Sequence, residues 1–492
     1  MRALGGFGIV LLISVWAAAQ TLPFRTHGDF YVVDQDLDGV LRFQDLDGDG
    51  DVQDAGEQIV FYDSTSPGPD LSNPQAITIH PFDGSVWISD TSLDVVLRLV
   101  DRNGDGDAND AGEYSIFYDA TGAVAISSVL ALSFDEQGIL FLLNSGTPDN
   151  VIRLEDKNKD GDALDPGEAT VFFDNTAVTG PWLQSPADMI FFQGHLYIGD
   201  NTITPKHIVR IRDLNHDGDA LDAGEAVRWA DPTAGGGSFV WNLIFELKGP
   251  ALFGVCITTG NVYRWQDLNK DGDALDPGEV VTFFDSANNA SSVSLKTSFT
   301  LTTDPLGSLY VCNHTADVIY RLTDLNADLD ANDAGEVVAY FSNTGTPTPA
   351  VLLGRARDCI IGPAGEVTPG MVSPAIGKTA DFLLDDPIGG GCFYAAALSY
   401  SSTGIPLGSP DIRVVPLGLD PLLVVSANVA LPIFIGFQGT LSGPGQAVAK
   451  LAVPALPALV SLRLHMAFVT VRPGAPSGIL TVSRPYSFVI GG

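Results

Sequence analysis

The chain has 492 residues, of which 60 are acidic and 25 basic, giving a formal net charge of −35. This excess of acid excludes nucleic acid and anionic membrane surfaces as main partners, because both are bound through basic faces. Single cores seldom exceed roughly 250 to 300 residues, so a chain of this length is expected to hold at least two domains.

The first 20 residues have the composition of a secretory signal peptide. One Arg precedes an apolar run from Phe7 to Trp16, and three alanines, Ala17 to Ala19, follow it. The apolar run is too short to span a membrane, and no later stretch reaches the roughly 18 apolar residues that a span needs. We therefore expect a chain without a membrane span, secreted or held at the cell surface, with residues 1–20 as its signal peptide.

Six copies of one acidic pattern follow at regular spacing. They begin at Asp45, Asp101, Asp156, Asp213, Asp267 and Asp324, so successive copies lie 56, 55, 57, 54 and 57 residues apart. In the second copy the runs QAITI, SVWIS, VVLRLV and YSIFYD have strand composition, and four short strands per repeat are typical of a propeller blade. The predicted fold class is all-β: a six-bladed β-propeller over 21–365, a linker over 366–374 and a C-terminal β-sandwich over 375–492.

The two ends of the repeat region predict how the ring closes. The first copy starts at DFYVV, the second strand of a blade, whereas RARDCII after the sixth copy has the pattern of a first strand. Pairing of Asp358 to Gly362 with the N-terminal blade would remove both open edges.

Three blades repeat one rhythm, in GSVWISDTSLDVVLR, GHLYIGDNTITPKHIVR and GSLYVCNHTADVIYR. In this rhythm, residues 28 to about 365 resemble the NHL and YWTD-like six-bladed propellers. Those families include binding modules and lyases, so the resemblance implies a fold and leaves the activity open. An acidic loop in every blade is not part of their usual pattern.

The acidic pattern has the ligand spacing of a calcium loop. In the second copy Asp101, Asn103 and Asp105 stand at positions 1, 3 and 5, and Gly106 stands at position 6. Ca²⁺ takes roughly six to eight oxygen ligands, and alternate residues before a glycine turn can converge on one ion. The predicted ligands are Asp45, Asp47, Asp49, Asp51 and Glu57; Asp101, Asn103, Asp105, Asp107 and Glu113; Asp156, Asn158, Asp160, Asp162 and Glu168; Asp213, Asn215, Asp217, Asp219 and Glu225; Asp267, Asn269, Asp271, Asp273 and Glu279; and Asp324, Asn326, Asp328, Asp330 and Glu336.

The first half of each loop resembles EF-hand and dockerin-type loops, but its end differs. Glu113 stands at position 13 instead of 12, so either Asp110 or Glu113 closes the site. Leu329 replaces the glycine in the sixth copy, which predicts a weaker site there. We expect Ca²⁺ to be mainly stabilising; solvated acidic hairpins without metal are the alternative. The earlier acidic run from Asp34 to Gly39 is interpreted as a turn between strands.

An arginine lies three residues before the first Asp of each loop. These arginines stand on a strand away from the channel, so they predict contacts between blades and not a ring of ligand-binding cations. They are Arg42, Arg98, Arg153, Arg210, Arg264 and Arg321.

The channel mouth is the expected ligand face of a propeller. Gln184, Trp241, Lys296 and Arg355 are predicted there, where they would hold a sugar or an anionic group, or plug the channel. Histidines fall at non-equivalent positions, and no GxSxG or HExxH motif occurs. The expected function is a monomeric binding or scaffolding module for an extracellular or cell-surface protein or polysaccharide. A hydrolase or lyase acting on a carbohydrate or ester in the channel is the alternative, and docking through the calcium loops is a third.

Four cysteines match no metal motif: Cys256, Cys312, Cys359 and Cys392. One or two disulfides are open, but Cys256 and Cys312 are interpreted as equivalent positions of neighbouring repeats, which favours buried free thiols. The C-terminal part is interpreted as about eight strands, LLVVSAN among them. Its ending MAFVTVRPGAPSGILTVSRPYSFVI resembles a module that recurs in large secreted bacterial proteins, which implies export and surface attachment.

Overall fold

The structure is a computed structural model of the whole chain. It describes residues 29–491 apart from 47–48, 82–83, 104, 136, 178–182, 202–206, 232–239, 246–250, 305–306, 346, 348, 350, 363–365, 370–373, 387–390, 401–404, 407–413, 416, 430, 443–444, 473–477 and 484–485. The predicted signal peptide lies outside the described residues.

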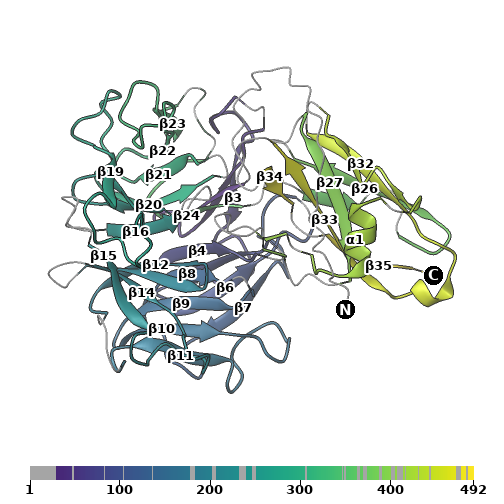
Figure 1. Cartoon of the computed structure of the whole chain (residues 1–492), viewed down its shortest axis with the longest axis horizontal. Coiled ribbons are helices and arrows are strands. Elements are labelled where there is room, and N and C mark those ends of the chain that lie inside the picture. The colour runs from purple at the N-terminus through teal and green to yellow at the C-terminus, as the bar shows by residue number, and fades with distance from the viewer. Residues whose placement is uncertain are drawn as a thin grey trace, which may run out of the picture.

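Within this described part, six four-stranded antiparallel sheets form a β-propeller (Figure 1). Blade 1 consists of β24 (Ala356–Ile361), β1 (Phe30–Asp34), β2 (Gly39–Phe43) and β3 (Gln58–Tyr62). Blade 2 consists of β4 (Pro74–Ile79), β5 (Val86–Asp90), β6 (Val95–Leu99) and β7 (Tyr114–Asp119). Blade 3 consists of β8 (Val129–Phe134), β9 (Leu140–Ser145), β10 (Asp149–Leu154) and β11 (Ala169–Asp174).

The remaining three blades follow in chain order. Blade 4 consists of β12 (Pro186–Phe192), β13 (His195–Asp200), β14 (His207–Ile211) and β15 (Ala226–Ala230). Blade 5 consists of β16 (Val240–Phe245), β17 (Leu252–Cys256), β18 (Val262–Trp265) and β19 (Val280–Phe284). Blade 6 consists of β20 (Ser298–Thr303), β21 (Leu309–Asn313), β22 (Val318–Leu322) and β23 (Val337–Ser342).

The ring closes by pairing the two ends of the repeat region. Strand β24 runs antiparallel to β1, with Val33 opposite Asp358 and Val32 opposite Cys359. The predicted closure is therefore confirmed. Because β24 and β2 pair with its two sides, β1 has no unpaired edge, and blade 1 has four strands like the other blades.

Apolar side chains between neighbouring blades hold the ring together. One cluster joins Phe30, Val32 and Leu41 of blade 1 to Tyr310 and Phe341 of blade 6. All five side chains are at most 1% exposed. Burial of such surface is the main driving force for folding, so each blade is stabilised chiefly by the blade beside it.

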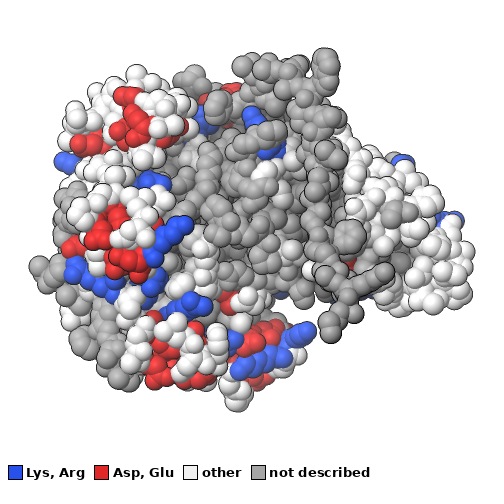
Figure 2. Space-filling view, in the orientation of Figure 1, with Lys and Arg blue, Asp and Glu red and all other residues white. Residues whose placement is uncertain are grey.

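The acidic loops join the third and fourth strands of each blade. In blade 2, for example, β6 ends at Leu99 and β7 begins at Tyr114, with the loop between them. Strands, and not helices, flank the loops among the described residues, so each loop belongs to a β-hairpin. Figure 2 shows their acidic side chains as separate clusters along the outer part of the ring.

The run from Asp34 to Gly39 is a turn between strands, as interpreted from the sequence. Asp34 pairs with Gly39 at the end of the β1–β2 hairpin, and its Oδ1 accepts hydrogen bonds from the amides of Asp36 and Leu37. This side chain is buried and holds the turn.

The C-terminal unit consists of two antiparallel sheets that share one apolar core, which includes Phe382, Tyr394, Phe434, Phe468 and Phe488. One sheet has the order β25 (Glu366–Pro369), β26 (Thr379–Asp385), β32 (Gln446–Ala452), β30 (Phe434–Ile435). The other has the order β31 (Gln438–Thr440), β27 (Phe393–Ser399), β33 (Arg463–Val471), β34 (Ile479–Val482), with β35 (Tyr486–Val489) also on β33. Short elements complete it: β28 (Ile405–Pro406), β29 (Val414–Val415), α1 (Pro421–Ala427) and the 3₁₀ helix η2 (Pro457–Leu459).

Two sequence-based expectations for this unit are wrong. The first residues of the segment interpreted as a linker, 366–374, form β25, which pairs with β26. The run LLVVSAN, interpreted as a strand, lies in helix α1. Asp420 accepts a hydrogen bond from the amide of Leu423, and Pro421 occupies the first turn, so a helix start overrides the β-branched residues.

The interpretation of Cys256 and Cys312 as equivalent positions is also wrong. Cys312 lies opposite Thr300 in its blade, whereas the residue opposite Asn242, the counterpart of Thr300, is Val255. Cys256 is therefore one residue further along its strand, and successive strand side chains point to opposite faces. All four cysteines lie among the described residues, and all four side chains are buried and in the thiol form in this structure.

No helix in the described part of the chain is both long and apolar enough to cross a membrane.

Candidate functional site

The acidic loops share one hydrogen-bonded frame. In the second loop Oδ2 of Asp101 accepts a bond of 2.9 Å from the amide of Gly106 at position 6. The same bond recurs in the other five loops, at Asp45, Asp156, Asp213, Asp267 and Asp324. In the sixth loop its donor is Leu329, which adopts a φ of 75° to make it. The turn at position 6 therefore persists without glycine.

Two acids converge on the Asn at position 3. In the second loop Nδ2 of Asn103 lies 2.9 Å from Oδ2 of Asp105 and 2.6 Å from Oδ2 of Asp110. Equivalent pairs of bonds are made by Asn158, Asn215, Asn269 and Asn326. Position 3 of the first loop, Asp47, lies outside the described residues. The Asp at position 10, which the sequence offered only as one of two possible closing ligands, therefore lies against the Asn at position 3 together with the Asp at position 5.

The Glu at position 13 is turned toward the main chain. Oε1 of Glu113 accepts bonds from the amides of Arg102 and Asn103, and its Oε2 accepts one from the amide of Asp110. This side chain is 3% exposed, and its counterparts Glu57, Glu168, Glu225, Glu279 and Glu336 are 2 to 3% exposed. Each carboxylate ties the start of its loop to the end.

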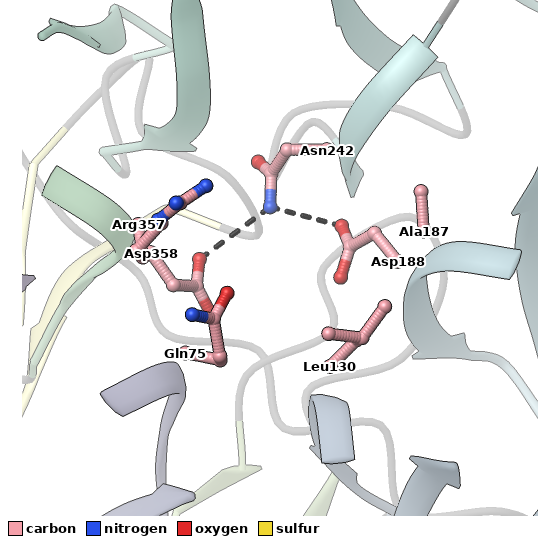
Figure 3. A pocket seen from close by; sticks show the side chains of 7 residues that line it. All are labelled: Gln75, Leu130, Ala187, Asp188, Asn242, Arg357 and Asp358. Carbon is pink, nitrogen blue, oxygen red and sulfur yellow. Dashed lines mark hydrogen bonds between the residues drawn. The ribbon is translucent and has the colours of Figure 1, made fainter. Parts of the chain in front are cut away.

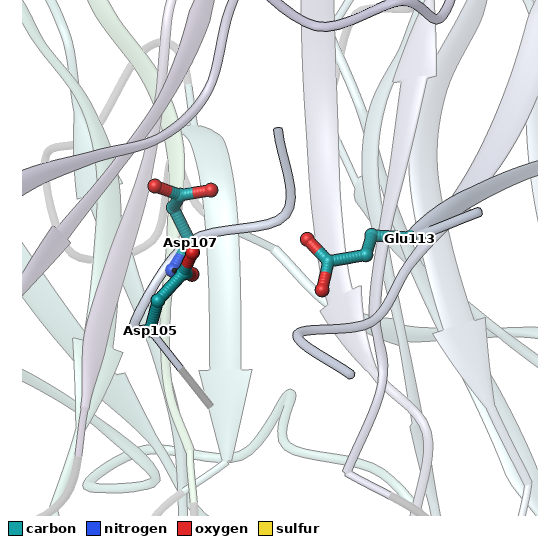
Figure 4. Close-up of side chains that lie close together, drawn as sticks. All are labelled: Asp105, Asp107 and Glu113. Carbon is teal, nitrogen blue, oxygen red and sulfur yellow. Dashed lines mark hydrogen bonds between the residues drawn. The ribbon is translucent and has the colours of Figure 1, made fainter. Parts of the chain in front are cut away.

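Carboxylates also gather around position 7. Oxygens of Asp105, Asp107 and Glu113 lie within 4.8 Å of one another (Figure 4). Burial, together with the charges of Asp105, Glu113 and Asp110, raises the pKa of Asp107. Asp105 and Asp107 are hard oxygen donors whose charges repel each other, which fits a hard divalent cation such as Ca²⁺, with Glu113 beside them.

Each loop also contacts the preceding blade. The amide at position 8 donates to a carbonyl of that blade's fourth strand, as from Ala108 to Phe61 over 2.7 Å. The corresponding donors are Val52, Ala163, Ala220, Ala274 and Ala331, with acceptors Tyr340, Phe117, Phe172, Trp229 and Phe283. These six bonds run around the whole ring, so the loops bridge every pair of adjacent blades.

Two of the repeated arginines make a second bridge of this kind. Nη1 of Arg42 donates to the carbonyl of Gly106 over 2.8 Å, and Nη1 of Arg321 donates to that of Gly50 over 3.1 Å. Each bond joins a blade to the loop of the next, as the sequence predicted. Arg153 pairs with Glu155 within its own blade instead.

A second candidate site lies in the central channel. A small cavity there is lined by Gln75, Leu130, Ala187, Asp188, Asn242, Arg357 and Asp358 (Figure 3). Nδ2 of Asn242 lies between the two carboxylates, 2.9 Å from Oδ2 of Asp188 and 3.4 Å from Oδ1 of Asp358. Three side chains from three different blades therefore meet at one point.

The main chain of the adjacent blades holds these carboxylates. Oδ2 of Asp188 accepts a bond from the amide of Leu243 in blade 5, and Oδ2 of Asp358 accepts one from the amide of Ile77 in blade 2. Oδ1 of Asp358 accepts a further bond of 3.1 Å from the hydroxyl of Thr300.

Desolvation alters the acidity of both groups. Burial, and then the charge of Asp358, raises the pKa of Asp188 well above its usual range. Burial raises the pKa of Asp358 to about 7. A carboxyl that titrates near neutral pH can either accept or donate a proton there.

None of the four residues predicted at the ligand face is among the described residues that line this cavity. Gln184 and Lys296 are exposed, and Arg355 contacts Gln35 and Asp36 at the β1–β2 turn. The side chain of Trp241 lies outside the described residues. Each innermost strand carries one extra residue, at Gln75, Leu130, Ala187, Trp241, Phe299 and Arg357. Gln184 and Lys296 lie three residues before this position and Arg355 lies two residues before it, so the sequence alignment placed the channel residues too early in these strands.

The position after this irregularity holds Ala76, Ala131, Asp188, Asn242, Thr300 and Asp358 in the six blades. Polar residues at the centre of otherwise apolar strands are the signal that could have identified Asp188, Asn242 and Asp358 as channel residues.

The fold and both sites define a β-propeller protein. No family model matches the chain, and no curated protein matches it. Solved structures to which the chain is similar include a gluconolactonase from Xanthomonas campestris (14% identity, 66% of this chain and 88% of that one, TM-score 0.39).

Two further similar structures are virginiamycin B lyase from Staphylococcus aureus (13% identity, 77% of this chain and 95% of that one, TM-score 0.35) and a PQQ-bound aldose sugar dehydrogenase from Streptomyces coelicolor (13%, 65% and 89%, TM-score 0.36). Likeness at this level transfers neither substrate nor activity to this chain.

Proposed function

We propose that the chain is an exported calcium-binding β-propeller that acts as a binding or scaffolding module, with Ca²⁺ in a mainly structural role. The observation that carries the proposal is the set of six equivalent bonds from position 8 of each loop to the preceding blade. An ion that orders a loop would thereby order the contact between two blades.

Residues at positions 1, 3, 5, 7 and 10 of each loop would hold the ion. In the third loop they are Asp156, Asn158, Asp160, Asp162 and Asp165, and Asn158 already lies against Asp160 and Asp165. The amide of Asn158 would turn its oxygen toward the cation, since carboxylate and amide oxygens are what Ca²⁺ prefers. Glu168 would instead brace the loop through main-chain amides.

A structural role follows from charge. The acids of one loop repel one another at short range, and the cost of that repulsion falls when a divalent cation lies among them. Extracellular calcium is abundant enough to keep weak sites filled, so binding would act as constant stabilisation by mass action.

Isothermal titration on the mature chain tests this proposal. The double variant Asp156→Asn, Asp160→Asn should bind one ion fewer than the parent chain and melt at a lower temperature in calcium. Asp381→Asn, which removes a surface ion pair with Lys450 in the C-terminal unit, is the matched control and should change neither quantity. Equal ion counts for all three proteins would contradict the proposal.

Pull-down from extracellular or cell-wall fractions separates binding from stability. If the loops themselves dock to a protein or polysaccharide, the double variant should lose the partner at a temperature where it remains folded. If the loops are structural, partner capture should survive wherever folding survives.

An enzyme acting in the channel is the second candidate function. The observation that favours it is the pair Asp188 and Asp358, held by Asn242 and with raised pKa values. Asp358 would transfer a proton to or from a carbohydrate or ester substrate. Hydrolysis or elimination with lactones, sugar esters and uronides should then disappear in Asp358→Asn and persist in the loop variant; equal rates for both variants would contradict an acid–base role.

A further inference from the structure

Two cysteines meet where the ring closes. Cys312 lies in β21 of blade 6, and Cys359 lies in β24, the closing strand of blade 1. They are 0% and 5% exposed and belong to the same apolar cluster. The site therefore joins the last blade to the strand that completes the first.

Thr300 shows how close the two side chains are. It lies directly opposite Cys312 in the β20–β21 pair, and its hydroxyl is 3.2 Å from Sγ of Cys359. Burial, and then the nearby thiol of Cys312, raises the pKa of the Cys359 thiol. Two cysteines can be bridged only when their side chains approach from neighbouring positions, and Thr300 lies opposite Cys312 and in contact with Cys359.

We propose that Cys312 and Cys359 form a disulfide as the ring closes in an oxidising environment, linking blade 6 to the closing strand. The other two cysteines have different surroundings. Sγ of Cys256 lies 3.4 Å from the hydroxyl of Thr258, and Cys392 is in the C-terminal unit. The oxidising environment is that of the proposed export, but the chemistry can be tested in solution without it.

The reaction needs an oxidant, for which a small disulfide such as oxidised glutathione suffices. One protein thiolate attacks this disulfide and releases one small thiol, forming a mixed disulfide. The second protein thiolate attacks the mixed disulfide and releases the other small thiol. Two protein thiols are oxidised to one disulfide, and one small disulfide is reduced to two thiols.

Burial decides when this reaction occurs. It hides both sulfur atoms and raises the pKa of Cys359, so little thiolate is present in the closed ring. Oxidation should therefore accompany folding or transient opening, and the folded reduced chain should resist the oxidant. Once formed, the bridge would hold β24 against blade 6, in place to pair with β1.

Refolding the full chain with oxidised and reduced glutathione tests the inference. Digestion without reductant, followed by mass spectrometry, should show a peptide pair cross-linked through Cys312 and Cys359, while Cys256 and Cys392 remain open to alkylation. The bridged protein should melt about 5 °C above the reduced one. Cys256→Ser should keep this difference, and Cys359→Ser should abolish it.

Alkylation counting keeps the test decisive if Cys359→Ser does not fold. Parent chain that refolds with glutathione and still carries four alkylatable thiols would overturn the inference. So would a bridge that involves Cys256 or Cys392. Either result would leave the calcium proposal untouched, because ion counting does not depend on the thiols.

Discussion

The amide of Ala163 in the third acidic loop donates a hydrogen bond of 2.9 Å to the carbonyl of Phe117 in blade 2. Ala163 is fully buried, so this bond is shielded from water. The loop that carries Asp156, Asp160 and Asp165 therefore forms part of the contact between two blades. An ion that orders these three carboxylates would therefore also order the contact between the two blades.

Removal of calcium should loosen these contacts all around the ring. The amides of Val52, Ala108, Ala163, Ala220, Ala274 and Ala331 should exchange with deuterium at least tenfold faster in EDTA than in calcium, because opening their loops costs less without the ion. The amide of Phe468 in the C-terminal unit, bonded to Ser483, serves as the control and should not change. Unchanged exchange rates at the six loop amides would show that calcium does not stabilise the contacts between blades.

The two late acids of a loop should respond differently to substitution. Glu113→Gln replaces an oxygen that accepts the Asp110 amide by a donor, so it should destabilise the calcium-free chain by about 1–3 kcal/mol. Asp110→Asn should leave that stability nearly unchanged and remove one calcium ion from the titration. Denaturant melts in EDTA, paired with ion counting, distinguish the roles; the reverse pattern would make Glu113 the closing ligand.

Leu329 should be a strained position. Its φ of 75° lies in the left-handed region, where a residue with a side chain pays about 1–2 kcal/mol. Leu329→Gly should therefore stabilise the chain by about 1 kcal/mol and tighten calcium at the sixth loop. Ala327→Gly, at a φ of 63° in the same loop, should also stabilise the chain, because the same strain is relieved there. A Leu329→Gly variant less stable than the parent would show that the side chain contributes more than the strain costs.

The channel carboxylates predict a pH dependence of stability. Burial raises the pKa of Asp358 from 3.8 to about 7, so the folded chain holds a proton that the unfolded chain releases. This contribution to stability is complete below about pH 4 and is lost as the pH rises to about 7. In EDTA, the stability of the parent chain relative to Asp358→Asn should therefore fall as the pH rises over that interval, because the variant has no group that titrates at this position. A difference that does not vary with pH would show that Asp358 is ionised in the folded state.

Repeat spacing and strand composition predicted the propeller, its closing strand and the hairpin position of the loops. These features depend on periodicity, which a single sequence records. The exact position along the innermost strand was not predictable in this way: Gln184 and Arg355 lie three and two residues before the irregularity, whereas Asp188, Asn242 and Asp358 follow it. The role of Glu113 depends on main-chain amides, and helix α1 on the cap at Asp420, neither of which residue type alone reveals.

Thermal melting of the mature chain with calcium and with EDTA, alongside ion counting by titration, is the decisive measurement for structural calcium in the loops. Four to six ions should bind, and chelation should lower the melting temperature steeply, because each ion stabilises a loop between two blades. A chain that binds no calcium and melts at the same temperature in both solutions would contradict this role of calcium.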